Sequence, residues 1–163
     1  MKRIIPALLF AVVCLSSCLD TTANFTPEVA VSPIFNTHGD TLVYRYDGMS
    51  GMYNVDSVVV GDTLMMSVGF NTIANNLIST HIGWDTTYMN VWSHFDDAIL
   101  SVLLSNSDTT KLDLYFPIGY NYLALPLWIV PKKAGGTMLK FTVVSDSKFS
   151  TKEEPLVLNI IEN

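Results

Sequence analysis

The sequence predicts an all-β protein, an antiparallel sandwich or barrel, from three observations. The chain of 163 residues is 49% hydrophobic and only 15% charged, which is typical of one globular domain and not of a disordered chain. Ten short runs rich in β-branched and aromatic residues follow one another, separated by turn-forming pairs such as Asp47-Gly48 and Gly61-Asp62. No long helical run lies between them, so a parallel βαβ arrangement is excluded.

The first element is a predicted secretory signal over residues 1–17. Lys2 and Arg3 precede an apolar run over residues 4–13, which is too short to cross a bilayer as a helix. The segment Leu15-Ser16-Ser17-Cys18 resembles the lipobox of bacterial lipoproteins. That resemblance implies cleavage before Cys18 and attachment of a diacylglycerol and a fatty acid such as palmitate to this residue.

The anchor sets the expected location and the cysteine chemistry. Leu19 follows Cys18, so the aspartate-after-cysteine pattern of inner-membrane retention is not met, and we expect the outer membrane, with its face left open. The chain has two cysteines, Cys14 and Cys18, and neither is available in the mature domain for a disulfide or a zinc site. Residues 18–28 are expected to form a tether, and residues 29–163 one domain.

The domain is predicted to consist of ten strands. The expected strands cover residues 29–35, 41–46, 53–60, 63–70, 77–84, 88–92, 111–116, 120–130, 137–144 and 156–161. Clean alternation over 64–70 and over 139–143 predicts one buried face for each of those two strands.

Two stretches resemble bacterial Ig-like domains. Asp56-Ser-Val-Val-Val-Gly-Asp-Thr-Leu64 is similar to the entry into their second strand, and the pattern from Gly136 to Asp146 is similar to their penultimate strand. The resemblance implies an Ig-like β-sandwich. One short helix is expected over residues 94–105, crossing between the sheets, because Ser93 and Asp96 have the spacing of a capping box before apolar residues at helical spacing.

Charge and motif patterns exclude several classes of function. The net charge of −6 provides no basic surface for phosphates, so no nucleic acid partner is expected. The three histidines, His38, His81 and His94, do not have the spacing of metal ligands, and the chain has no Gly-x-Ser-x-Gly, Walker or dinucleotide motif. We therefore expect no metal, no cofactor and no enzymatic activity, and a hydrolase is the less favoured alternative.

An aromatic row is the candidate ligand-binding site. Tyr88 and Trp92 share one face if the strand over 88–92 is continuous, and they then offer two surfaces on which sugar rings can stack. The Asn90 amide is expected nearby if a bulge or loop turns it the same way. Trp84 and Trp128 are expected in the core, because a sandwich needs large apolar residues inside.

A tripeptide of Asp, then Ser or Thr, then an apolar residue or Thr occurs six times. It resembles the O-glycosylation acceptor of exported proteins of Bacteroidetes-type bacteria, whose lipoproteins the chain also resembles in its signal. Turn chemistry at the ends of strands explains the same pattern, so both interpretations stay open. The implied acceptor residues are Thr21, Thr41, Ser57, Thr63, Thr86 and Thr109.

The expected function is that of a non-catalytic domain, held at the outer membrane by its lipid, that binds a glycan or a surface protein. The alternative is a structural or assembly subunit without a small-molecule ligand. A glycan binder should show aromatic side chains around a shallow cleft with amide or carboxylate partners. A scaffold should show a flat apolar patch or an unpaired strand edge.

Overall fold

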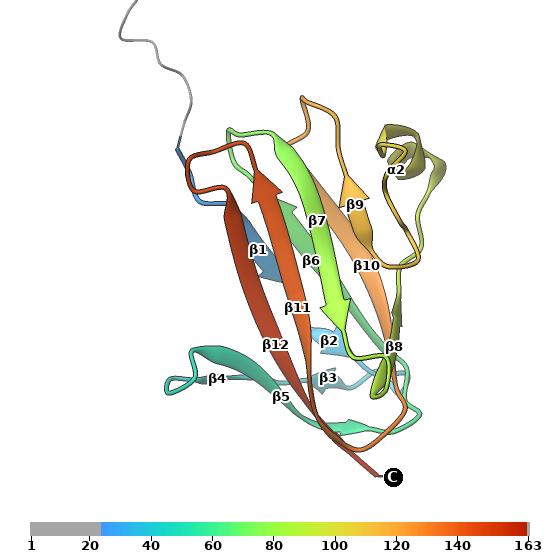
Figure 1. Cartoon of the computed structure of the whole chain (residues 1–163). Helices are drawn as coiled ribbons and strands as arrows, with labels where there is room; N and C mark the ends of the chain where they lie inside the picture. Colours follow the sequence, from blue (N-terminus) through green and yellow to red (C-terminus); the bar gives the residue numbers. More distant parts are fainter. Residues whose placement is uncertain (1–23, 163) are drawn as a thin grey trace, which may run out of the picture.

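The computed structural model describes residues 24–162, and these form two β-sheets packed face to face (Figure 1). The first sheet, sheet A, has the strand order β3-β2-β6-β10-β8, with β1 also paired to β6; the second, sheet B, has the order β4-β5-β12-β11-β7-β9. The protein is therefore an all-β, Ig-like sandwich, and that part of the prediction is confirmed. The predicted signal, the lipobox and Cys18 lie outside the described residues.

The first four strands of the chain are short, and the last three are the longest. In sheet A they are β1 (Glu28–Val31), β2 (Ile34–Phe35), β3 (Thr41–Leu42), β6 (Leu64–Asn71), β8 (Met89–Trp92) and β10 (Tyr122–Pro131). In sheet B they are β4 (Tyr44–Asp47), β5 (Met52–Val59), β7 (Leu77–Trp84), β9 (Asp113–Tyr115), β11 (Gly135–Ser145) and β12 (Thr151–Ile161).

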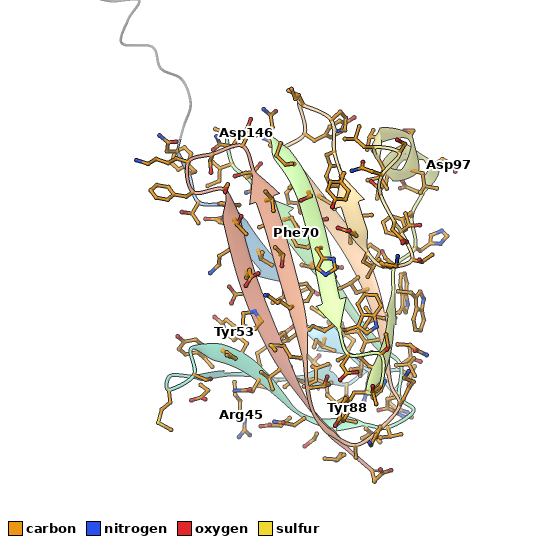
Figure 2. All side chains as sticks on the ribbon, in the orientation of Figure 1. Arg45, Tyr53, Phe70, Tyr88, Asp97 and Asp146 are labelled. Carbon is orange, nitrogen blue, oxygen red and sulfur yellow. The ribbon has the colours of Figure 1, made fainter. Side chains whose placement is uncertain are left out.

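The core lies between the sheets and follows the predicted alternation. Leu64, Val68 and Phe70 of β6 are fully buried, and so are Phe141 and Val143 of β11. Every second residue of these strands faces the opposite sheet, because side chains alternate between the two faces of a strand. Figure 2 shows Phe70 between the two layers.

Two predicted strands are each split in the structure. Ser32 and Pro33 separate β1 from β2, since proline has no N–H for the ladder. At Val43 the chain leaves sheet A after β3 and enters sheet B as β4. The Tyr44 hydroxyl donates a hydrogen bond to the Ser32 carbonyl and so joins the two sheets at this crossing, and burial raises the pKa of Tyr44 to about 12.

The strand pairing is antiparallel except at one place. β12 pairs with β5 in parallel. The two strands lie far apart in the sequence, so no hairpin joins them. The pairing shifts in register where Asp56 and Ser57 together face Asn159, and Ser57 has a φ of 62° at this bulge.

The helix is shorter than predicted and begins at a different residue. The helix α2 covers Asp97–Val102, and its N-cap is Asp96, whose carboxylate accepts a hydrogen bond from the Ile99 N–H at 2.8 Å. Ser93 does not cap it. The segment does cross from β8 in sheet A to β9 in sheet B, as expected. No helix in residues 24–162 is long and apolar enough to span a membrane.

The two ends of the described chain lie at opposite ends of the sandwich (Figure 1). At the entry end, the Lys148 N–H in the β11–β12 hairpin donates to the Asn24 side chain at 3.3 Å. At the other end, Gly135 at the start of β11 pairs with Ile160 near the end of β12. With a rise of about 3.3 Å per residue, the two ends are roughly 30 Å apart along β11.

Candidate functional site

A large hollow in the described surface lies on sheet B, at the end of the sandwich remote from the chain entry. Its volume is about 630 Å³. The residues that line it come from β5, β7, β11, β12 and the turn after β7, and they are Met52, Gly83, Trp84, Asp85, Tyr88, Gly136, Thr137, Met138, Lys140 and Val157. Figure 2 shows Tyr88 at this end and Asp146 at the opposite one.

Glycines open the hollow and leave strand backbone exposed in it. Gly83 of β7 and Gly136 of β11 both line the hollow, and neither has a positive φ. A Cβ at Gly136 would meet only Asn159 Oδ1 at 3.9 Å, which is an ordinary van der Waals contact. The backbone therefore does not require glycine at Gly136, and a larger side chain there would fill the hollow.

Gly135 allows the Tyr88 ring to approach the start of β11. A Cβ at Gly135 would lie 2.8 Å from the Tyr88 Cε1 atom, and the φ of this glycine is +139°. Lys133 Nζ lies 5.5 Å from the centre of the same ring, within the range of a cation–π contact. Tyr88 is therefore held between the β10–β11 turn and the core, with part of its surface in the hollow.

Asp85 contributes a carboxylate beside the two aromatic residues. Its Oδ1 atom accepts a hydrogen bond from the Thr87 N–H at 2.8 Å. Hydrogen bonds from Thr87, together with the charges of Lys132 and Lys133, lower the pKa of Asp85 below its usual value of 3.8. The carboxylate is therefore ionised at neutral pH and accepts hydrogen bonds from hydroxyl or amine donors.

A second hollow of about 350 Å³ adjoins the first, and the two share Gly83 and Trp84. Its lining continues through His81 and Thr86 to Thr110 and Lys111. Together the two hollows form a shallow groove that crosses β7.

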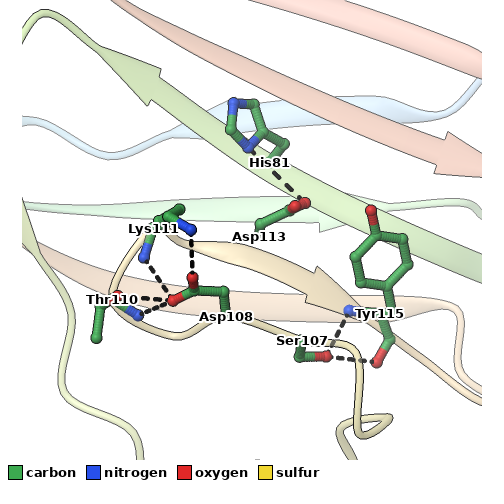
Figure 3. Close-up of polar contacts among 7 residues, drawn as sticks. All are labelled: His81, Ser107, Asp108, Thr110, Lys111, Asp113 and Tyr115. Carbon is green, nitrogen blue, oxygen red and sulfur yellow. Dashed lines mark hydrogen bonds and ion pairs between the residues drawn. The ribbon is translucent and has the colours of Figure 1, made fainter.

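The loop before β9 borders this groove and is held by one carboxylate (Figure 3). Asp108 accepts hydrogen bonds from Thr110 Oγ1 at 2.6 Å and from the Lys111 N–H at 3.2 Å, and Lys111 Nζ lies 2.9 Å away. These contacts, first among them the Thr110 hydroxyl, lower the pKa of Asp108.

The titratable residues near the groove make local contacts. His81 Nδ1 faces Asp113 Oδ1 of β9 at 3.8 Å, a long and half-exposed contact (Figure 3). Asp96 is occupied as the helix cap. Within residues 24–162 no group of three His, Cys, Asp or Glu side chains is placed to hold a metal ion.

The structure separates the residues of the predicted aromatic row. Tyr88 lies in the turn before β8, so the strand over 88–92 is not continuous, and Tyr88 and Trp92 do not form one row. Asn90 and Trp92 share the outer face of β8 by simple alternation, without a bulge. Trp92 is 44% exposed.

The expectation for Trp84 and Trp128 requires correction as well. Trp84 packs against the core but also lines both hollows. Trp128 lies on the outer face of β10, because the inward positions of that strand are the odd-numbered residues from Leu123 to Ile129. The alternation of Leu123, Leu125 and Leu127 with smaller residues carries the signal for this placement, because it puts Trp128 on the face opposite the leucines.

The implied O-glycosylation residues differ in exposure. Thr41, Ser57 and Thr86 are exposed, whereas Thr63 and Thr109 are half-buried. Thr21 lies outside the described residues. Exposure leaves the first three accessible to a modifying enzyme.

Comparisons with known proteins give distant likenesses that carry no argument. No protein-family model matches the sequence, and no curated protein matches it significantly. A family 123 glycoside hydrolase from Clostridium perfringens shares 8% identity over 85% of this chain at a TM-score of 0.44, and this chain spans 28% of its length.

Two further solved structures are similar at the same distant level. PapD-like domain 7 of human CEP192 has 10% identity and a TM-score of 0.39, covering 83% of this chain and 86% of that one. AggA, the major subunit of aggregative adherence fimbriae type I from Escherichia coli, has 11% identity and a TM-score of 0.36, covering 85% and 99%. At this level the likeness concerns the sandwich fold alone.

Proposed function

We propose that the chain is a lipid-anchored, non-catalytic domain of the outer membrane that binds a glycan in the groove over sheet B. The observation that carries the proposal is the combination of Trp84 and Tyr88 with the ionised carboxylate of Asp85 around a shallow hollow of about 630 Å³. Sugar rings have apolar faces that stack on aromatic side chains and hydroxyls that donate to carboxylates. The exposed backbone at Gly83 and Gly136 leaves room for the ring between them.

The position of the groove supports this role. The described chain enters the sandwich at the end where Asn24 contacts the β11–β12 hairpin, and the groove lies at the opposite end. A lipid at Cys18 would therefore leave the groove directed away from the membrane surface. The second hollow extends the site toward Thr110, which suits a chain of several sugar units better than a single one.

The expected affinity is low. Each aromatic stack contributes on the order of 1 kcal/mol, so two stacks and a few hydrogen bonds give a dissociation constant in roughly the millimolar range. Capture of a polysaccharide would then depend on many anchored copies that bind one polymer together.

The test is electrophoresis of the full chain in native gels cast with amylopectin, xylan or mannan. Gly136→Val should fill the hollow and remove the retardation shown by the parent, and Asp85→Asn should weaken it. Gly48→Val is the matched control, because its Cβ meets no atom within 4 Å and Gly48 does not line the hollow. Equal melting temperatures establish that all variants are folded. Retardation that survives Gly136→Val would refute the groove as the site.

A further inference from the structure

Exposed apolar side chains gather at the end of the sandwich where the described chain begins. Three loops lie at this end, over residues 72–76 between β6 and β7, 116–121 between β9 and β10, and 146–150 between β11 and β12 (Figure 1). Together with the entry segment, residues 24–27, they form the entry surface. Each of the four segments contributes one exposed apolar residue: Phe25 (47% exposed), Ile73 (37%), Ile118 (85%) and Phe149 (54%).

One asparagine joins the three loops. Asn76 donates from its N–H and from its Nδ2 atom to the Asp146 carboxylate, at 2.8 and 2.6 Å, and its Oδ1 atom accepts from the Gly119 N–H at 2.8 Å. A further hydrogen bond runs from Asn121 Nδ2 to the Ile73 carbonyl at 2.9 Å. These bonds fix the three loops to one another, so their apolar side chains are held on the outside of the protein.

The entry surface has no net charge. Its four segments contain one acidic residue, Asp146, and one basic residue, Lys148, whereas the whole chain has a net charge of −6. Glu28 follows the entry segment as the first residue of β1, and Asp97 of α2 lies to one side of this end (Figure 2). A neutral surface can approach a bilayer with anionic lipids, which would repel an acidic one. Any attraction to a bilayer is therefore expected to come from the apolar side chains.

The length of chain before Asn24 indicates what covers this end. Six residues separate Asn24 from Cys18, the expected site of the lipid, and six residues span at most about 20 Å. The hydrogen bond from the Lys148 N–H to the Asn24 side chain places Phe149, the next residue, beside the point of entry. A lipid on Cys18 therefore holds the entry surface within about 20 Å of the headgroups.

We propose that the entry surface rests on the lipid bilayer, with the side chains of Phe25, Ile73, Ile118 and Phe149 at the boundary between headgroups and acyl chains. The proposal rests on the lipid anchor of the proposed function and adds a second contact with the same membrane. Exposed apolar and aromatic side chains are stabilised at this boundary. The lipid keeps the protein on the membrane, and the entry surface fixes its orientation, with the groove of sheet B at the end that points away.

The test measures the depth of a dye on the full, membrane-purified chain. Ser150→Cys, beside Phe149, is labelled with a nitrobenzoxadiazole maleimide and reconstituted into phosphatidylcholine vesicles with or without doxyl-labelled acyl chains. The dye should lose about half of its fluorescence to the doxyl lipid, since side chains at the headgroup boundary lie within roughly 10 Å of the acyl region. The same dye on Met49→Cys should not be quenched. Met49 is 98% exposed in the turn between β4 and β5, away from the entry surface (Figure 1). The parent chain measures background labelling.

Ile118→Ser combined with Phe149→Ser should abolish the quenching of the dye on Ser150→Cys. Both residues are exposed, so the fold should tolerate the change, and equal melting temperatures establish that it does. Met49→Ser is the matched control, because it removes an exposed apolar side chain elsewhere and should leave the quenching unchanged.

Several outcomes would overturn the proposal. These are equal quenching at residues 49 and 150, quenching that persists in the double variant, and quenching that requires added phosphatidylglycerol, which would indicate attraction to Lys148 instead of apolar contact. Flotation of the vesicles separates this proposal from the anchor. A chain that floats with the vesicles but whose dye at residue 150 is not quenched refutes the bilayer contact alone, whereas a chain that does not float refutes the anchor and this contact together. Loss of glycan retardation by Gly136→Val would leave the quenching unaffected.

Discussion

Ser93 Oγ donates a hydrogen bond to the carbonyl oxygen of Pro126 at 2.7 Å, and this contact marks where β8 stops pairing with β10. In an antiparallel strand the N–H and C=O of one residue point to the same side. The position at which Pro126 lacks an N–H therefore faces β8, next to Ser93 and beyond Trp92, the last residue of β8 that pairs with β10. The hydrogen bonds between β10 and β6 are unaffected. A proline is tolerated in a central strand for this reason.

Ser93→Ala should lower the free energy of unfolding by about 1 kcal/mol, because it leaves the Pro126 carbonyl without its protein donor. Urea denaturation of the two chains measures the difference. Ser105→Ala, in the exposed loop after α2, is the control and should change stability by less than about 0.5 kcal/mol. Equal effects of the two substitutions would show that water replaces the Ser93 hydroxyl without cost.

Gly135→Ala should destabilise the protein by at least about 1 kcal/mol. The added Cβ would lie 2.8 Å from Tyr88 Cε1, and a φ of +139° is strained for any residue with a side chain. The adjacent substitution Gly136→Ala should have a much smaller effect, since the nearest atom to its Cβ would be Asn159 Oδ1 at 3.9 Å, an ordinary van der Waals contact. Melting temperatures of the two variants compare the positions directly, and a larger shift for Gly136→Ala would contradict the packing of Tyr88 against the β10–β11 turn.

Stability should decrease below about pH 4, with a contribution from Asp108. Hydrogen bonds from Thr110 and Lys111 lower the pKa of Asp108 in the folded state below its usual value of 3.8. A group with a lowered pKa stabilises the fold above the unfolded-state value, and this stabilisation is lost as the pH falls through the folded-state value. Urea midpoints measured between pH 2 and pH 7 should therefore depend less steeply on pH for Asp108→Asn than for the parent. Parallel curves for the two chains would show that Asp108 does not contribute.

Cys18→Ala should leave the precursor uncleaved, because the thiol of this residue is the expected acceptor of the lipid that precedes cleavage. Intact-mass measurement of the membrane fraction distinguishes the precursor from a lipid-modified chain that begins at residue 18. Cys14→Ala is the matched control and should be processed like the parent. A mature chain that begins elsewhere and carries no lipid would contradict the lipobox interpretation.

Local patterns in the sequence were sufficient for the strands that bury one face. The alternation of Leu64, Val68 and Phe70 with outward-facing residues predicts β6 correctly, because successive side chains of a strand point to opposite faces of the sheet. The exchange of sheets at Val43 has no such local signature. It depends on Tyr44 reaching the Ser32 carbonyl from the other sheet.

The sequence by itself determined the all-β class, the positions of most strands along the chain and the lack of cysteine beyond residue 18. Only the tertiary structure decided which aromatic residues share a surface: Tyr88 joined Trp84 and Asp85 at the groove, and Trp92 joined Trp128, Met65 and Phe35 across four strands. The physical reason is that a strand's period fixes the two faces of that strand alone. Which residue stands opposite on the next strand depends on register, and register is set by turns, bulges and packing far away in the sequence.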